Sequence, residues 1–222
     1  MKMQKTHIYF MPGMAANSKI FEYIKLPENL FETHFLEWDL PINNESLEAY
    51  ALRMTKKIKH KNPILFGVSF GGILVQEMSK FIATKKVVVV SSVLHECEFP
   101  TRMKFAKKTK AYKLVPTSFF SNVENIAKYA LGETATNRVE LYKKYMYVND
   151  KRYLDWAIKE IINWKQKEIP SNVLHIHGAK DKVFPIKNIK GKNVIIIKNG
   201  THVMIINKYK WFNENLPQLL TA

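Results

Sequence analysis

The chain has 222 residues, of which 46% are hydrophobic and 12% aromatic, a composition that excludes an intrinsically disordered protein and suits one domain. Its single cysteine, Cys97, excludes an internal disulfide bond, and no apolar run approaches the roughly 18–20 residues that a transmembrane helix needs. The formal net charge is +16, which raises the question of an anionic partner.

Lysine carries nearly all of this positive charge. Only four of the 35 basic residues are arginines, and the lysines are spread along the whole chain. Nucleic-acid sites favour arginine because its planar guanidinium binds two acceptors at once. We therefore expect no nucleic-acid partner, while electrostatic attraction of an anionic substrate stays open. The apolar run at 8–11 ends at Pro12 and is shorter than the roughly 7–15 apolar residues of a secretory signal, so we expect a cytoplasmic location. No pattern indicates an oligomeric state.

Strand and helix patterns alternate along both ends of the chain. Apolar periodicity at i, i+3, i+4, i+7 and i+11 from Leu47 predicts a helix, and the four consecutive valines at 87–90 predict a strand buried on both faces. Further strands are predicted at 7–11, 34–38, 63–68, 172–177 and 193–197, and further helices at 71–82 and 207–219. This alternation predicts an α/β fold with a doubly wound, mostly parallel sheet of about six strands.

Residues 94–167 interrupt the alternation. They contain no convincing buried strand and are too long for a plain connection. We interpret them as a helical cap inserted into a core made of residues 1–93 and 168–222; the alternative is that they continue the core as extra crossover helices. The segment is rich in aromatic residues: Phe105, Tyr112, Phe119, Phe120, Tyr129, Tyr142, Tyr145, Tyr147 and Trp156.

The sequence Gly-Val-Ser-Phe-Gly at 67–71 is the strongest candidate for a catalytic motif. It fits Gly-x-Ser-x-Gly and lies where the strand at 63–68 ends and the helix at 71–82 begins. Small residues two positions before and after Ser69 let the chain make a sharp turn. The helix N-terminus favours negative charge that develops there. The alternative, a phosphate-binding loop, lacks the Lys-Ser/Thr of a P-loop and the spacing of a dinucleotide loop.

At these residues the chain resembles the α/β-hydrolase superfamily, whose serine nucleophile lies on such a turn. The resemblance covers most of the chain outside 94–167, and it implies a compact member that lacks the first two strands of larger ones, which leaves six. It also implies an oxyanion hole made of the backbone N–H groups of Phe70 and Met14. Met14 lies in Pro-Gly-Met at 12–14, where the family usually has His-Gly-x, so the loop must be supported differently. A plain turn is the alternative.

A serine nucleophile needs a base and an acid that orients the base. In the family these follow the serine in the order acid, then histidine. The resemblance assigns the base to His202, between the last strand and the closing helix, and the acid to Asp181, in His-Gly-x-x-Asp-x-x-x-Pro at 177–185. A solvated loop histidine and a turn aspartate are the alternatives, and Glu96 or Glu98 is a rival acid.

These residues predict a serine hydrolase that cleaves a carboxylic ester or thioester of a small-molecule acyl substrate through an acyl-enzyme. An acyltransferase or C–C bond hydrolase with the same triad, or a ligand-binding protein on the same scaffold, remains an alternative. No His, Cys, Asp or Glu residues have the spacing of a metal site along the sequence, so we expect neither a metal nor a cofactor.

Overall fold

The computed structural model describes residues 5–114, 144–145, 150–191 and 193–221. Six strands within this part of the chain form one fully parallel sheet in the order β2-β1-β3-β4-β5-β6. The strands are β1 (Thr6–Met11), β2 (Phe31–Phe35), β3 (Ile64–Val68), β4 (Lys86–Val90), β5 (Val173–Gly178) and β6 (Val194–Ile197).

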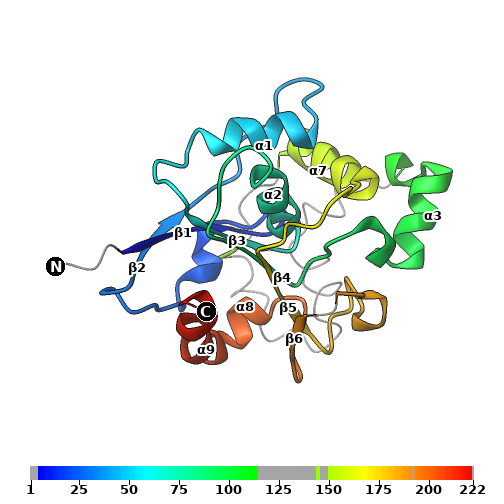
Figure 1. Cartoon of the computed structure of the whole chain (residues 1–222). Helices are drawn as coiled ribbons and strands as arrows, with labels where there is room; N and C mark the ends of the chain where they lie inside the picture. Colours follow the sequence, from blue (N-terminus) through cyan, green and yellow to red (C-terminus); the bar gives the residue numbers. More distant parts are fainter. Residues whose placement is uncertain (1–4, 115–143, 146–149, 192, 222) are drawn as a thin grey trace.

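Helices cover both faces of this sheet (Figure 1). One face carries α1 (Leu47–Thr55), α2 (Phe70–Met78) and α7 (Lys151–Asn163), and the other carries α8 (Met204–Asn207) and α9 (Tyr209–Thr221). The doubly wound α/β fold predicted from the sequence is confirmed. The remaining described helices are α3 (Thr101–Thr109) and the short 3-10 turns η1 (Ser18–Phe21), η2 (Glu96–Glu98), η3 (Ala111–Leu114) and η5 (Ile186–Asn188).

Two apolar cores form because successive strand residues point to opposite faces. Tyr9 and Leu65 face the core under α1, α2 and α7, whereas Phe10 and Phe66 face the core over α8 and α9. The valines at 87–90 alternate in the same way and are fully buried. The continuous apolar runs in the sequence thus mark the central strands correctly.

The edge strand β2 departs from its predicted bounds. The sequence predicts a strand at 34–38, but β2 spans Phe31–Phe35 and pairs with β1 from Thr6 opposite Phe31. Leu36 and Trp38 are buried in the core although they follow the end of the strand. The apolar pattern therefore marks the segment that leaves β2, and the half-exposed edge strand itself carries few apolar residues.

Helix α7 lies within the segment interpreted as a cap. Its buried residues Tyr153, Leu154 and Trp156 belong to the same core cluster as residues of the sheet and of α1 and α2. This packing fits the alternative of an extra crossover helix for that stretch, and the cap boundaries at 94 and 167 stay a prediction. Five cap aromatics lie outside the described residues: Phe119, Phe120, Tyr129, Tyr142 and Tyr147.

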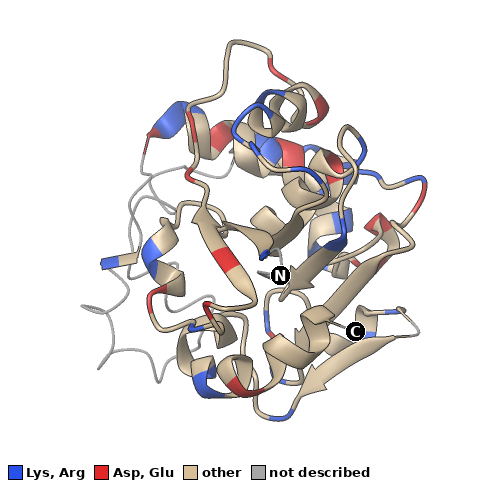
Figure 2. Ribbon diagram, turned by 60° about the vertical axis from the view of Figure 1, so that its left-hand side comes forward, with Lys and Arg blue, Asp and Glu red and all other residues tan. Residues whose placement is uncertain are grey.

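The charged side chains do not gather on one element. Figure 2 shows lysine and arginine on several helices, loops and strand ends, with acidic residues among them. Among the described residues, none of the helices combines the length and the apolar content needed to cross a lipid bilayer.

The central position of Phe66 gives a test of the core. Phe66 is fully buried on β3 between Phe10 and Phe21, with ring centroids 4.8 and 6.0 Å away. We expect Phe66→Ala to lower the free energy of unfolding by about 3–5 kcal/mol, because the change removes buried contacts and leaves a cavity. Urea unfolding would measure this loss. Phe105→Ala is the control, since the Phe105 side chain is 64% exposed and its loss should change little; equal losses in both variants would contradict the packing described here.

Candidate active site

Ser69 lies on a sharp turn between β3 and α2. Its backbone has φ 52° and ψ −119°, a positive φ that residues with a side chain rarely adopt. Its N–H donates to the carbonyl of Val90 at 2.9 Å, and its carbonyl accepts from the Ser92 hydroxyl at 2.7 Å. These bonds hold both ends of the residue in the unusual conformation.

Two glycines make the turn possible. A Cβ at Gly67 would overlap the carbonyl of Gly71, and a Cβ at Gly71 would overlap the carbonyl of Pro12. Only glycine fits such close backbone approaches. The Gly-x-Ser-x-Gly pattern therefore reflects the steric demands of the turn at Ser69.

The structure brings Ser69, His202 and Asp181 together in a chain of hydrogen bonds. Ser69 Oγ lies 2.9 Å from His202 Nε2, and His202 Nδ1 lies 2.9 Å from Asp181 Oδ2. His202 stands on the loop between β6 and α8, and Asp181 on the loop after β5. All three residues therefore follow the carboxyl ends of strands, where open α/β sheets place their ligand sites.

Asp181 is buried and fully engaged. Its Oδ1 accepts from the backbone N–H groups of Val183 and Phe184 at 2.8 and 2.9 Å, which leaves Oδ2 for His202. Burial acts to raise the pKa of Asp181, but the charge and hydrogen bond of His202 outweigh burial and hold that pKa below its usual range. The carboxyl group is therefore an ionised acceptor that can orient an imidazole.

The rival acids make other contacts. Glu98 is buried and accepts from the backbone N–H groups of Leu94 and Lys190, at 2.7 and 2.8 Å. Glu96 accepts from the Gln166 N–H at 3.1 Å. Each of these carboxylates ties loops together, and neither is hydrogen-bonded to His202.

The expected oxyanion donors lie beside Ser69. The backbone N–H groups of Met14 and Phe70 donate to no other described residue. A Cβ built on Gly13, next to Met14, would be 3.4 Å from the Cβ of Ser69, so this loop passes directly by the serine. The N–H groups of Met14 and Phe70 therefore stay the predicted donors to a developing oxyanion.

The same loop is supported by residues that the sequence did not single out. The Trp38 indole N–H donates to the carbonyl of Gly13 at 2.8 Å, and the N–H of Ala15 donates to the Tyr153 hydroxyl at 3.2 Å. The Trp38 ring also stacks on Phe70, with centroids 4.8 Å apart. Trp38 and Tyr153 thus hold the loop that contains Gly13 and Met14.

Comparison with known proteins is informative only at the level of structure, since no family model and no curated protein matches the sequence. A hydrolase from Pseudomonas aeruginosa matches with a TM-score of 0.75 at 14% identity, over 98% of this chain and 91% of that chain. An esterase from Exiguobacterium antarcticum matches with a TM-score of 0.74 at 16% identity, over 99% and 93%. A bromoperoxidase from Bacillus anthracis matches with a TM-score of 0.68 at 16% identity, over 99% and 93%. The chain has the α/β-hydrolase fold.

Two histidines lie beneath the acid loop of this α/β-hydrolase fold. His177 is buried, its Nε2 donates to the carbonyl of Phe184 at 2.8 Å, and its Nδ1 lies 3.3 Å from His175 Nε2. Burial, reinforced by neighbouring His177, lowers the pKa of His175 to about 3. His177 therefore supports the loop of Asp181, and the ring of His175 contacts His177 from behind; burial favours the neutral form of both.

The buried His175 predicts a pH dependence of stability. Its pKa in the folded protein, about 3, lies below the value of 6.5 for a free histidine, so between these values the unfolded chain binds the extra proton. The stability due to neutral His175 is present above about pH 6.5 and is lost as the pH falls toward 3. In His175→Gln, the slope of unfolding free energy against pH should fall by up to about 1.4 kcal/mol per pH unit in this window. Urea unfolding at several pH values would measure it, and equal slopes would refute the assignment.

Proposed function

We propose that the protein is a serine hydrolase that cleaves a carboxylic ester or thioester through an acyl-enzyme intermediate. The single observation that carries the proposal is the continuous hydrogen-bond chain from Ser69 Oγ through both nitrogens of His202 to the buried Asp181. Nucleophile, base and orienting acid are the three groups that acyl transfer by serine needs. The solved structures with the same fold include an esterase and a lipase-esterase related protein, which supports this class of reaction.

In the first half of this mechanism, Ser69 Oγ attacks the acyl carbon and its proton passes to His202 Nε2. Asp181 holds the Nδ1–H of His202 and stabilises the imidazolium that forms. The carbonyl oxygen gains negative charge and accepts from the N–H groups of Phe70 and Met14. The tetrahedral intermediate collapses, and the leaving alcohol or thiol takes the proton from His202.

In the second half, a water molecule replaces the leaving group. His202 Nε2 takes a proton from the water, and the resulting hydroxide attacks the acyl carbon of the Ser69 ester. The second tetrahedral intermediate uses the same two N–H donors. Its collapse releases the carboxylic acid and returns the proton to Ser69 Oγ. The cycle uses only residues of this chain and water.

Turnover of p-nitrophenyl esters and acyl thioesters of increasing acyl length tests the function directly. Hydrolysis with release of the free acid, absent in Ser69→Ala, is the expected result. Acyl transfer to an added alcohol in place of water would indicate an acyltransferase with the same triad. Binding of these compounds without turnover would contradict the proposal in favour of a ligand-binding protein.

Covalent labelling tests the nucleophile. A fluorophosphonate probe should modify one residue, Ser69, because only a serine activated by a base attacks the phosphorus. Peptide mass spectrometry of the folded protein would locate the label. Ser69→Ala should abolish it without loss of fold, as checked by circular dichroism. A label on another residue, or an unlabelled folded wild-type protein, would overturn the assignment.

Substitution of the acid tests the orientation of the base. Asp181→Asn should reduce kcat by a factor on the order of 10³–10⁴. The amide oxygen is expected to keep the N–H groups of Val183 and Phe184, so that the NH₂ group faces His202 Nδ1, donates to it and favours the wrong tautomer. Steady-state kinetics would measure this factor. The matched control is Glu96→Gln, whose partner is a backbone N–H on another loop and which should retain most activity. If Glu96→Gln or Glu98→Gln removed activity and Asp181→Asn did not, the acid would be misassigned.

A further inference from the structure

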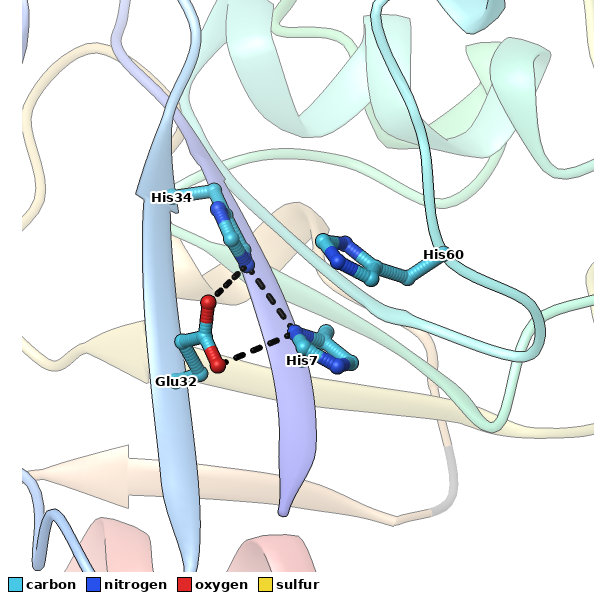
Figure 3. Close-up of side chains that lie close together, drawn as sticks. All are labelled: His7, Glu32, His34 and His60. Carbon is cyan, nitrogen blue, oxygen red and sulfur yellow. Dashed lines mark hydrogen bonds and ion pairs between the residues drawn. The ribbon is translucent and has the colours of Figure 1, made fainter. Parts of the chain in front are cut away.

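Three histidines and one glutamate lie close together at the edge of the sheet (Figure 3). His7 lies near the start of β1, Glu32 and His34 lie on β2, and His60 lies in the segment between α1 and β3. We call these four residues the histidine cluster.

Strand pairing creates the cluster. The parallel register places His7 beside Glu32 and Tyr9 beside His34. Residues two apart on a strand point to the same face, so the side chains of these four strand residues, Tyr9 included, lie on one face of the sheet. This is the face on which Tyr9 enters the core with α1. The chain that leaves α1 brings His60 back onto the same face, where its ring stacks on His7 with centroids 3.5 Å apart.

The donor atoms of the cluster already lie close to one another. His7 Nδ1 and His34 Nε2 are 3.0 Å apart, and oxygens of Glu32 lie 3.8 and 3.7 Å from these two nitrogens. One ligand atom from each of the four residues lies within 4.8 Å of the others. Tetrahedral zinc with bonds of about 2.0–2.1 Å places its ligand atoms about 3.3 Å apart, so the widest separation must shorten by only about 1.5 Å.

His60 makes a hydrogen bond of the kind that a metal-binding histidine makes, through its second ring nitrogen, to a group that is not itself a ligand. His60 Nδ1 lies 2.7 Å from the Tyr9 hydroxyl, which also accepts from the backbone N–H of Lys59 at 3.1 Å. With the proton on Nδ1, His60 donates to Tyr9 and leaves Nε2 free to bind. Such a bond fixes both the tautomer and the orientation of a histidine ligand.

We propose that the histidine cluster binds one divalent transition-metal ion of the zinc type. Three imidazoles and one carboxylate suit zinc, cobalt or nickel, whereas magnesium and calcium prefer sets of oxygen ligands. Four protein ligands leave no open position, so the ion is structural: it joins β1, the edge strand β2 and the segment after α1.

Metal titration of the full chain tests the site without reference to catalysis. Calorimetry with Zn²⁺ should show one ion bound per chain. Co²⁺ should give the intense visible absorption bands of a tetrahedral ion. Zn²⁺ should also raise the Tm of the wild-type protein, because an ion that binds only the folded state stabilises it. No binding of Zn²⁺, or only the weak absorption of octahedral Co²⁺, would overturn the proposal.

Variants locate the ion. His60→Gln should weaken Zn²⁺ binding at least tenfold and remove the Tm shift, and Tyr9→Phe should weaken binding by about 10–100-fold through loss of the outer partner. His95→Gln is the control for loss of any surface histidine, and His202→Gln is the control for binding at the triad; both should bind as the wild type does. Wild-type affinity in His60→Gln, or loss of binding in His202→Gln alone, would refute the site.

Folding of the variants is checked by circular dichroism without metal. If His60→Gln fails to fold, Glu32→Ala serves in its place, because the Glu32 side chain is 50% exposed. It should weaken Zn²⁺ binding at least tenfold as well, and unchanged affinity would count against the proposal.

Discussion

Ser69 has a backbone conformation that costs energy, and the candidate active site depends on its being held there. A residue with a side chain at φ 52° and ψ −119° stores on the order of 1–3 kcal/mol, which the surrounding structure must supply. The Val90 carbonyl and the Ser92 hydroxyl, both at the end of β4, fix the two ends of the residue. The parallel pairing of β3 with β4 thus positions Ser69, because it brings those groups to the turn.

At the other end of the hydrogen-bond chain that starts at Ser69, the surroundings of the buried Asp181 decide whether its carboxyl group is ionised. Asp181 is removed from water, which by itself would favour the neutral acid, and its ionised form persists because His202 and two backbone N–H groups contact it. His177 and His175 fill the space beneath the loop as neutral rings.

The sequence predicts the central features of the fold and of the site because they rest on local rules. Steric limits at Gly67 and Gly71 leave a readable motif, and burial on both faces leaves the valine run at 87–90. The edge strand β2 is misplaced because only one of its long sides is paired and its residues are mostly exposed, so the apolar pattern shifts to the chain that follows it.

Features that arise from contacts between distant segments leave no such pattern. Trp38 and Tyr153 reach the loop at 12–16 from a strand exit and from α7, and nothing in their own neighbourhoods marks them as supports. The histidine cluster escapes a search by spacing for the same reason. Its members are separated by 25, 2 and 26 positions along the chain, and only strand register and the return after α1 bring them together.

The edge strand β2 links the histidine cluster to the loop beside Ser69. β2 carries Glu32 and His34, and the chain that leaves its carboxyl end leads to Trp38, whose indole N–H donates to the carbonyl of Gly13 beside Ser69. β2 is paired on one side only, so an ion that ties it to β1 acts on an edge strand of the sheet. Trp38 is itself buried and stacked on Phe70, which keeps the loop at Gly13 in place independently of that tie. A metal at the histidine cluster should therefore change the stability of the fold far more than the chemistry at Ser69.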